Sequence, residues 1–171
     1  GRLPAPELTV AATDLLAGVS LRPTTPDDRE FLVGLYADTR KAELDQVLWP
    51  EGARDAFVRM QFDAQDVQYR GANPQGTFDV VEVDGVPAGR LYVDRRASDI
   101  RIVDVALLSE FQGRGIGGAL VRTVVEEAAA SGRTASIHVE VHNRARALYE
   151  RLGFTPVEER GLYLLLEWRA P

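Results

Sequence analysis

Cysteine is absent from the 171 residues of this chain, which excludes disulfides, thiol nucleophiles and thiolate metal sites. Histidine is nearly absent: His138 and His142 are too few to build a histidine-rich zinc centre. No apolar run approaches the roughly 20 residues that a membrane-spanning helix requires, and the first residues lack the apolar segment of a signal peptide. We therefore expect a soluble, cytoplasmic protein with no metal site and no membrane partner.

Positive charge is scarce relative to negative charge, with 20 basic against 26 acidic residues and a formal net charge of −6. There is no dense basic run, so a nucleic-acid partner is not expected. With 45% hydrophobic residues and this length, the chain can form one globular core. We expect residues 1–18, which contain prolines and end at Gly18, to be an N-terminal extension, and residues 19–171 to form a single domain.

Hydrophobic spacing and turn residues predict the element order β-α-α-β-β-β-α-β-α-β. The expected strands are 19–22, 78–83, 86–93, 100–108, 135–141 and 162–168, and the expected helices begin near residues 25, 53, 115 and 143. The apolar residues that indicate the second helix follow alternate steps of four and three: Ala53, Phe57, Met60, Ala64 and Val67. This order predicts an α/β (α+β mixed) fold, with helices on both faces of a central mixed, mostly antiparallel sheet.

A glycine-rich turn joins the strand that ends near Leu108 to the helix that follows. Backbone N–H groups at such a helix start are unpaired and lie at the positive end of the helix dipole, where phosphate oxygens bind. Glycines let a pyrophosphate approach the backbone without a Cβ in the way, and Arg114 can add a charged contact. The alternative interpretation is a tight strand-to-helix turn that needs glycine for its geometry alone.

The same turn also fits the dinucleotide-binding pattern G-x-G-x-x-G, with Gly113, Gly115 and Gly118 in place and Glu140 downstream. Two features argue against this alternative. Four residues, 109–112, separate the strand from the first glycine, whereas the dinucleotide pattern follows its strand directly. The preceding strands also form hairpins and not a βαβ array.

Two motifs at a particular separation are more specific than the glycine turn alone. The run from Gln112 to Gly117 reads QGRGIG, and the segment from Asn143 to Phe154 contains Asn143, the triplet ALY at 147–149 and LGF at 152–154. Through these motifs, and through the element order from Val19 to Trp168, the chain resembles the GNAT superfamily of N-acetyltransferases. Members of that superfamily transfer an acetyl group from acetyl-CoA to an amine. One departure from the family is Ser109, where many members have proline.

The resemblance implies a GNAT-like sheet and a binding site for acetyl-CoA. The amides from Gln112 to Gly117 would hold the pyrophosphate, and the strand ending at Leu108 would diverge from the strand ending at Val141 and pair with the pantetheine arm. Asn143 would contact the cofactor. The expected cofactor-binding residues are Leu107, Leu108, Gln112, Gly113, Arg114, Gly115, Ile116, Gly117, Gly118 and Asn143. A homodimer is compatible with the resemblance, since dimers are common in the family.

The chemistry implied by the resemblance needs an oxyanion donor, an acid and a base. A backbone N–H near Leu107 can stabilise the tetrahedral oxyanion, and Tyr149 can protonate the leaving thiolate of CoA. Asp104 is the first candidate for removing a proton from the acceptor ammonium, with Glu140 and His138 as alternatives. Each assignment has a structural alternative: Asn143 as a helix cap, Tyr149 as a core aromatic and Asp104 as half of an ion pair.

The first two helices and their connection are expected to form the acceptor wall, because they precede the sheet and the cofactor occupies its other side. The candidate wall residues are Arg40, Glu43, Trp49, Met60, Gln61 and Gln65. The sequence thus favours an acetyl-CoA-dependent N-acetyltransferase acting on a small amine or a peptide amine. The alternative from another class is a non-catalytic CoA-binding regulatory module.

Overall fold

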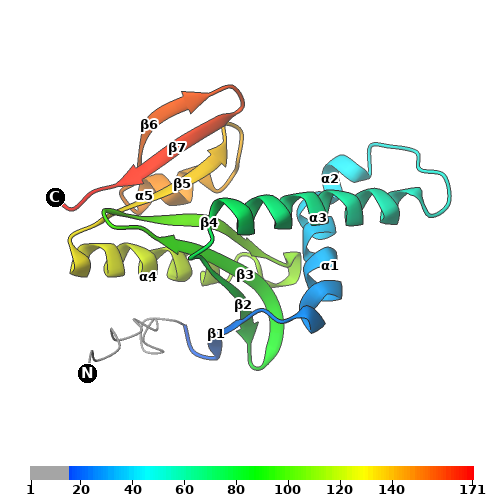
Figure 1. Ribbon diagram of the computed structural model, residues 1–171, viewed down its shortest axis with the longest axis horizontal. Helices are drawn as coiled ribbons and strands as arrows, with labels where there is room; N and C mark the ends of the chain where they lie inside the picture. The colour runs from blue at the N-terminus through cyan, green and yellow to red at the C-terminus, as the bar shows by residue number, and fades with distance from the viewer. Residues whose placement is uncertain (1–15) are drawn as a thin grey trace.

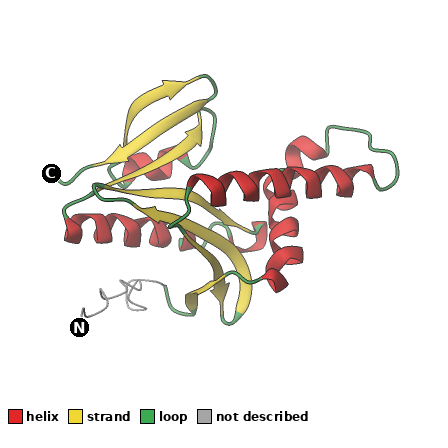
Figure 2. Ribbon diagram, viewed as in Figure 1, coloured by secondary structure: helices red, strands yellow, loops and turns green. Residues whose placement is uncertain are grey.

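A computed structural model describes residues 16–171 of the chain (Figure 1). One seven-stranded sheet has the strand order β1-β2-β3-β4-β5-β7-β6 and carries helices on both faces, as Figure 2 shows by element type. The strands are β1 Val19–Pro23, β2 Thr77–Val83, β3 Val86–Arg95, β4 Asp99–Leu107, β5 Thr134–Glu140, β6 Thr155–Arg160 and β7 Tyr163–Trp168. The helices are η2 Pro26–Asp28, α1 Arg29–Thr39, α2 Lys41–Leu44, α3 Ala53–Ala72, η3 Ser109–Phe111, α4 Ile116–Ser131 and α5 Arg146–Arg151. The predicted α/β class with a mixed, mostly antiparallel sheet is confirmed.

The predicted element order lacks three elements that the structure contains, the one-turn helices α2 and η3 and the edge strand β6. Every residue of β6 is exposed, and its sequence TPVEER has a proline and three charges in place of an alternating apolar pattern. It forms a strand because it pairs with β7, so its own sequence does not indicate a strand. Residues 1–15 of the expected N-terminal extension lie outside the described residues. None of the helices from residue 16 onward is both long enough and apolar enough to cross a bilayer.

The sheet splits in its middle, between β4 and β5. These two strands run parallel and pair from Asp99 to Ile102 against Thr134 to Ile137. Beyond Ile102, β4 continues to Leu107 without β5 beside it. The predicted divergence of the two strands is therefore present, and it leaves a gap at their carboxyl ends.

A β-bulge in β4 decides which side chains face each side of this gap. Tyr92 of β3 lies opposite Asp104, whereas its neighbour Val93 lies opposite Ile102, so Val103 is an extra residue in β4. Because side chains alternate along a strand, one extra residue exchanges the two faces beyond it. Asp104 consequently shares a face with Tyr92, on the side of the sheet covered by α1 and α3.

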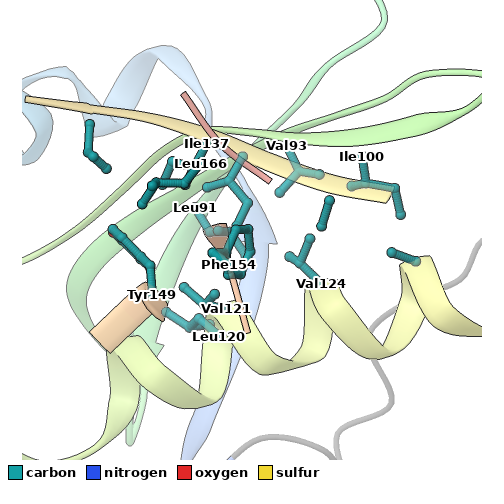
Figure 3. Close-up of a cluster of buried hydrophobic side chains, with 14 of the residues drawn as sticks. Leu91, Val93, Ile100, Leu120, Val121, Val124, Ile137, Tyr149, Phe154 and Leu166 are labelled. Carbon is teal, nitrogen blue, oxygen red and sulfur yellow. The ribbon is translucent and has the colours of Figure 1, made fainter. Parts of the chain in front are cut away.

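The two faces of the sheet carry separate cores. The larger core lies between the sheet and the helices α4 and α5 (Figure 3), and it contains Leu91, Ile100, Leu120, Val124, Ile137, Tyr149, Phe154 and Leu166. The smaller core joins α1, α2 and α3 through Leu32, Val33, Leu44, Val58 and Phe62. The donor-side motifs at α4 and α5 and the acceptor-side helices α1 and α3 therefore belong to opposite layers.

The helix predicted from residue 53 is confirmed as α3, but the apolar residues that indicated it lie largely on its exposed side. Phe57, Met60 and Val67 are 37%, 58% and 73% exposed. Val58 and Phe62 are buried in their place, because α3 carries a second apolar stripe and this one packs on α1. The spacing predicted the helix correctly, since both stripes follow the helical period.

Candidate active site

A row of unpaired amides opens α4. Gly113 and Gly115 have φ values of +75° and +81°, a left-handed conformation that glycine adopts without strain. The first backbone bond of the helix runs from the Ala119 N–H to the Gly115 carbonyl at 3.1 Å. Within residues 16–171, none of the six successive N–H groups from Gly113 to Gly118 has a hydrogen-bond acceptor. Such a row of donors at the positive end of a helix dipole suits a pyrophosphate.

Gln112 differs from its neighbours in this turn. Its backbone N–H donates to the Ser109 carbonyl at 3.2 Å, so this amide is already paired. Its side-chain Nε2 donates to the Leu107 carbonyl at 3.0 Å. Gln112 therefore fixes the turn against the end of β4.

The other residues of the turn divide between the core and the solvent. Ile116 is buried in the larger core. Arg114 is exposed, with its guanidinium 5.2 Å from the centroid of the Phe111 ring, which leaves its N–H groups available to an anion. A Cβ on Gly117 would lie 3.8 Å from Leu107 Cδ1, and one on Gly118 would lie 3.5 Å from Leu148 Cδ1. Both distances are ordinary van der Waals contacts, so neither position excludes a small side chain.

Gly89 of β3 is a residue of this site that sequence analysis missed. A Cβ at this position would lie 2.2 Å from the Ala106 carbonyl oxygen and 3.1 Å from Leu107 Cα. Glycine alone lets β3 approach the end of β4 this closely. The Leu108 N–H donates to the Ala88 carbonyl of β3 at 2.8 Å. Successive N–H groups of a strand point to alternate sides, so the Leu107 N–H points away from β3, toward the β5 side.

Asp38 of α1 is a second residue that sequence analysis missed. One of its oxygens, Oδ2, accepts hydrogen bonds from the Ser109 N–H at 2.8 Å and from the Ser109 hydroxyl at 2.9 Å. Proline at position 109 would have neither donor. The sequence feature that could have indicated this contact is Ser109, which departs from the family pattern. Its partner Asp38 lies 71 residues away in the sequence.

Tyr149 lies on α5 at the edge of the larger core (Figure 3) and is 5% exposed. Its ring meets Phe154 edge-on, with the ring centroids 6.1 Å apart. Burial, and to a smaller extent the negative charge of Asp104, raises the pKa of Tyr149 to about 12. The phenol is therefore protonated at neutral pH.

Asn143 precedes α5 and is exposed. Its side-chain Oδ1 accepts the Ala145 N–H at 2.8 Å, and its backbone carbonyl accepts the Arg146 N–H at 3.1 Å. Asn143 is not the helix cap considered from the sequence: the N-cap residue of α5 is Ala145, and Asn143 closes a turn just before it. Within the described part of the chain the Asn143 amide nitrogen has no acceptor, so it stays available to a cofactor.

Asp104 forms an ion pair with Arg90, whose side chain is 5% exposed. Nε of Arg90 donates to Asp104 Oδ2 at 2.5 Å, and its Nη2 donates to the Gln65 Oε1 at 2.7 Å. The guanidinium also lies 5.8 and 4.8 Å from the ring centroids of Tyr69 and Tyr92. The other oxygen of Asp104, Oδ1, has no partner within residues 16–171. The predicted ion-pair alternative is therefore present, and half of the carboxylate remains free.

One residue of the predicted acceptor wall contacts the partner of Asp104: Gln65 accepts a hydrogen bond from Arg90. Arg40 lies 3.5 Å from Glu43 and 3.4 Å from Glu140. Burial raises the pKa of Tyr69; Asp104 adds to this increase, whereas Arg90 and Arg40 oppose it.

Trp49 and Met60 are not part of this group. The Trp49 indole donates to the Leu44 carbonyl at 2.9 Å and packs on Phe57, closing the smaller core, while Met60 is 58% exposed on α3. Gln61 is half-buried on the same helix.

His138 occupies the same sheet face as Glu140, further along β5. Its Nδ1 lies 3.0 Å from Arg101 Nη1. Burial, together with the charge of Arg101, lowers the pKa of His138, so the ring is neutral at neutral pH. It lines a cavity of about 220 Å³ with Glu158, Arg160, Tyr163 and Leu165. His142 is exposed beyond the end of β5.

Comparisons with known proteins agree with this architecture. The model of the acetyltransferase (GNAT) family matches residues 16–154. The fold and this match define an acetyltransferase. The chain belongs to the GNAT family of acetyltransferases.

One similar curated protein is a candidate ribosomal protein bS18-alanine N-acetyltransferase of Bacillus subtilis (strain 168). It is 33% identical over 86 residues, which are 49% of this chain and 57% of that protein. The chain thus spans little more than half the length of this curated relative.

Several solved structures share the fold over nearly the whole chain. The PaiA N-acetyltransferase of Thermoplasma acidophilum, solved with coenzyme A, has a TM-score of 0.67 and 16% identity over 89% of this chain and 99% of that chain. An acetyltransferase of Thermus thermophilus has a TM-score of 0.62 and 22% identity, covering 90% and 97%. RimL, a ribosomal L7/L12 alpha-N-protein acetyltransferase solved with coenzyme A, has a TM-score of 0.61 and 20% identity, covering 90% and 94%.

Proposed function

We propose that the chain transfers the acetyl group of acetyl-CoA to a primary amine of a small molecule or peptide, by direct attack within a ternary complex. The observation that carries this proposal is the gap between β4 and β5. Asp104 lies on β4 beyond the last residue that pairs with β5, and Tyr149 lies on α5 in the larger core. The row of unpaired amides opens α4 a few residues further along the chain.

The amides from Gly113 to Gly118 would hold the pyrophosphate of acetyl-CoA, with Arg114 adding a charged contact. Leu107 and Leu108 would line the pantetheine arm, because β4 has no neighbouring strand on that side beyond Ile102. Asn143 would donate its free side-chain amide from the opposite side of the gap. Gln112 would act through the side chain that fixes the turn, since its own amide is already paired.

Acetyl-CoA supplies an activated acyl group as a thioester. The neutral nitrogen of the acceptor attacks the thioester carbonyl carbon, a C–N bond forms, and the C–S bond then breaks. The Leu107 N–H, which faces the gap, would donate to the oxygen that becomes negative. Holding donor and acceptor side by side also removes much of the entropic barrier.

Tyr149 would donate its phenolic proton to the departing sulfur and regain a proton from solvent. The raised pKa supports this role, because the group is fully protonated at the pH of the reaction. Its ring is packed against Phe154, which keeps the hydroxyl in a fixed position.

Asp104 would accept a hydrogen bond from the acceptor ammonium through its free Oδ1 and take one proton before the nitrogen attacks, because an ammonium has no lone pair. The bonded nitrogen would lose its second proton to solvent as the C–S bond breaks. Arg90 holds Oδ2 and orients the carboxylate, and the proton would then pass on to solvent. Glu140, 3.4 Å from Arg40, is the nearest alternative for this proton transfer. His138 stays a weaker alternative because Arg101 occupies its Nδ1.

The first acceptor to test is the N-terminal amine of a protein. Two of the similar proteins carry names for acetylation of that group, on ribosomal protein bS18 and on L7/L12. The carboxylates of Asp104, Glu43 and Glu140 around the gap also favour a cationic amine.

The test is a panel of amines assayed by release of the CoA thiol. The panel contains N-terminal peptides, free amino acids and polyamines, each with an N-acetylated control that lacks the reactive nitrogen. The proposal predicts thiol release with at least one free amine, none with its blocked control, and loss of release in Asp104→Asn. The proposal would be contradicted if no amine in the panel became acetylated, even where the CoA thiol is released.

A further inference from the structure

The hydrogen bonds between Asp38 and Ser109 join the two halves of the site. Asp38 lies in the last turn of α1, and Ser109 is the first residue of η3, which leads directly into the row of amides. Within residues 16–171, no other side-chain hydrogen bond joins α1 to segment 108–115. The contact is therefore a single, well-defined connection between an acceptor-side helix and the cofactor turn.

The contact has the chemistry of a helix cap. The Ser109 N–H lies at the start of η3 and has no backbone acceptor among the described residues, so Asp38 Oδ2 satisfies it at 2.8 Å. The Ser109 hydroxyl adds a second bond to the same oxygen at 2.9 Å. Bonds to an ionised carboxylate are stronger than neutral ones, so the contact can transmit a restraint.

The end of α1 also reaches the acceptor side of the gap. Arg40 follows Asp38 by two residues and lies between Glu43 and Glu140. A movement of the cofactor turn that shifts Ser109 therefore shifts the segment that carries Arg40.

We propose that Asp38 is a positioning residue that couples cofactor binding to the acceptor side of the site. Cofactor that orders the turn would restrain the end of α1 through Ser109, and a bound acceptor would restrain the turn in return, since coupling between two sites is reciprocal. The inference rests on the proposed use of the turn and of the α1 end, and Ser109 is the residue that makes it possible in this chain.

Hydrogen exchange followed by mass spectrometry, with and without CoA, tests the coupling in the full chain. In the unsubstituted protein, we expect CoA to slow amide hydrogen exchange about fivefold or more, both in residues 112–118 and in residues 36–40. In Asp38→Ala and in Ser109→Pro the slowing remains at 112–118 and disappears at 36–40. Asp38→Asn, which keeps an acceptor oxygen without the charge, gives a partial effect.

Glu30→Gln is the matched control, because Glu30 is also an α1 carboxylate but bonds to Arg59 on α3. It leaves the CoA effect at 36–40 unchanged. If Ser109→Pro fails to fold, Asp38→Ala and Asp38→Asn carry the test alone.

Three results would overturn the coupling: no slowing at 36–40 in the natural protein, the same slowing in Asp38→Ala, or no binding of CoA. Failure of the proposed function looks different. It would leave the CoA effect on exchange intact while no amine in the panel is acetylated.

Discussion

Single side chains in this protein combine a structural with a chemical duty, and Arg90 is the clearest case. Its guanidinium is buried and its carboxylate partner is Asp104. Breaking a buried pair leaves the remaining charge unpaired, so we expect Arg90→Met to lower the free energy of unfolding by about 3 kcal/mol. Denaturant unfolding measures this loss.

The matched control for Arg90 is Arg29→Met, which breaks the exposed pair with Asp63. Exposed pairs contribute about 1 kcal/mol or less. Equal losses in the two variants would show that Arg90 and Asp104 are not a buried pair.

Tyr149→Phe removes one oxygen and keeps the ring packing. We expect kcat to fall about a hundredfold or more, with the affinity for CoA unchanged, because general acids contribute at least this factor. Steady-state kinetics and CoA titration give the two numbers. Unchanged kcat would remove Tyr149 from the acid role.

The raised pKa of Tyr149 also determines how kcat depends on pH in the alkaline range. An acid works only while protonated, so a pKa of about 12 keeps Tyr149 active throughout the range below about pH 11. We predict that kcat measured from about pH 8 to about pH 10.5 shows no fall that titrates near 10, the ordinary value for tyrosine. Such a fall would mean that burial does not raise the pKa of Tyr149.

The close approach of strands β3 and β4 depends on the missing side chain of Gly89. Gly89→Ala would place a Cβ 2.2 Å from the Ala106 carbonyl oxygen, so β3 and β4 must separate at the end that carries Leu107. We expect a loss of about 2 to 3 kcal/mol in unfolding free energy and weaker CoA binding. Gly71→Ala, where a Cβ meets nothing within 4 Å, is the control: it leaves CoA binding unchanged and does not lower the unfolding free energy, because alanine favours a helix more than glycine does.

Most elements could be predicted from the sequence because their signal is local. The glycine turn and the amphipathic pattern of α4 each lie within a few residues, and both are confirmed. β6 could not be predicted, because an exposed edge strand is set by its partner β7. The bulge at Val103 leaves no local signal either, yet it puts Asp104 on the same face as Tyr92.

The candidate site divides in the same way. The motifs identified the turn residues and Tyr149 as candidates, whereas Asp38, Gly89 and Arg90 were missed. Each of these three acts on a residue distant in sequence, as with Arg90 and Asp104 fourteen positions apart. Such contacts exist only once the sheet is assembled.

The protein as a unit is two layers of helices that meet at a split in one sheet. Helices α4 and α5 pack on one face over the larger core, and α1 and α3 form the smaller core on the other (Figure 1). The parallel pairing of β4 with β5 stops at Ile102, so beyond that residue β4 has no neighbouring strand on the β5 side.

An amide NMR titration of the labelled protein with acetyl-CoA tests whether the turn before α4 holds the pyrophosphate. We predict that the amide signals from Gly113 to Gly118 move downfield together and saturate at one equivalent, while NAD leaves them unchanged. Signals from Gly113 to Gly118 that stay in place while acetyl-CoA binds elsewhere, or that respond to NAD instead, would contradict the account.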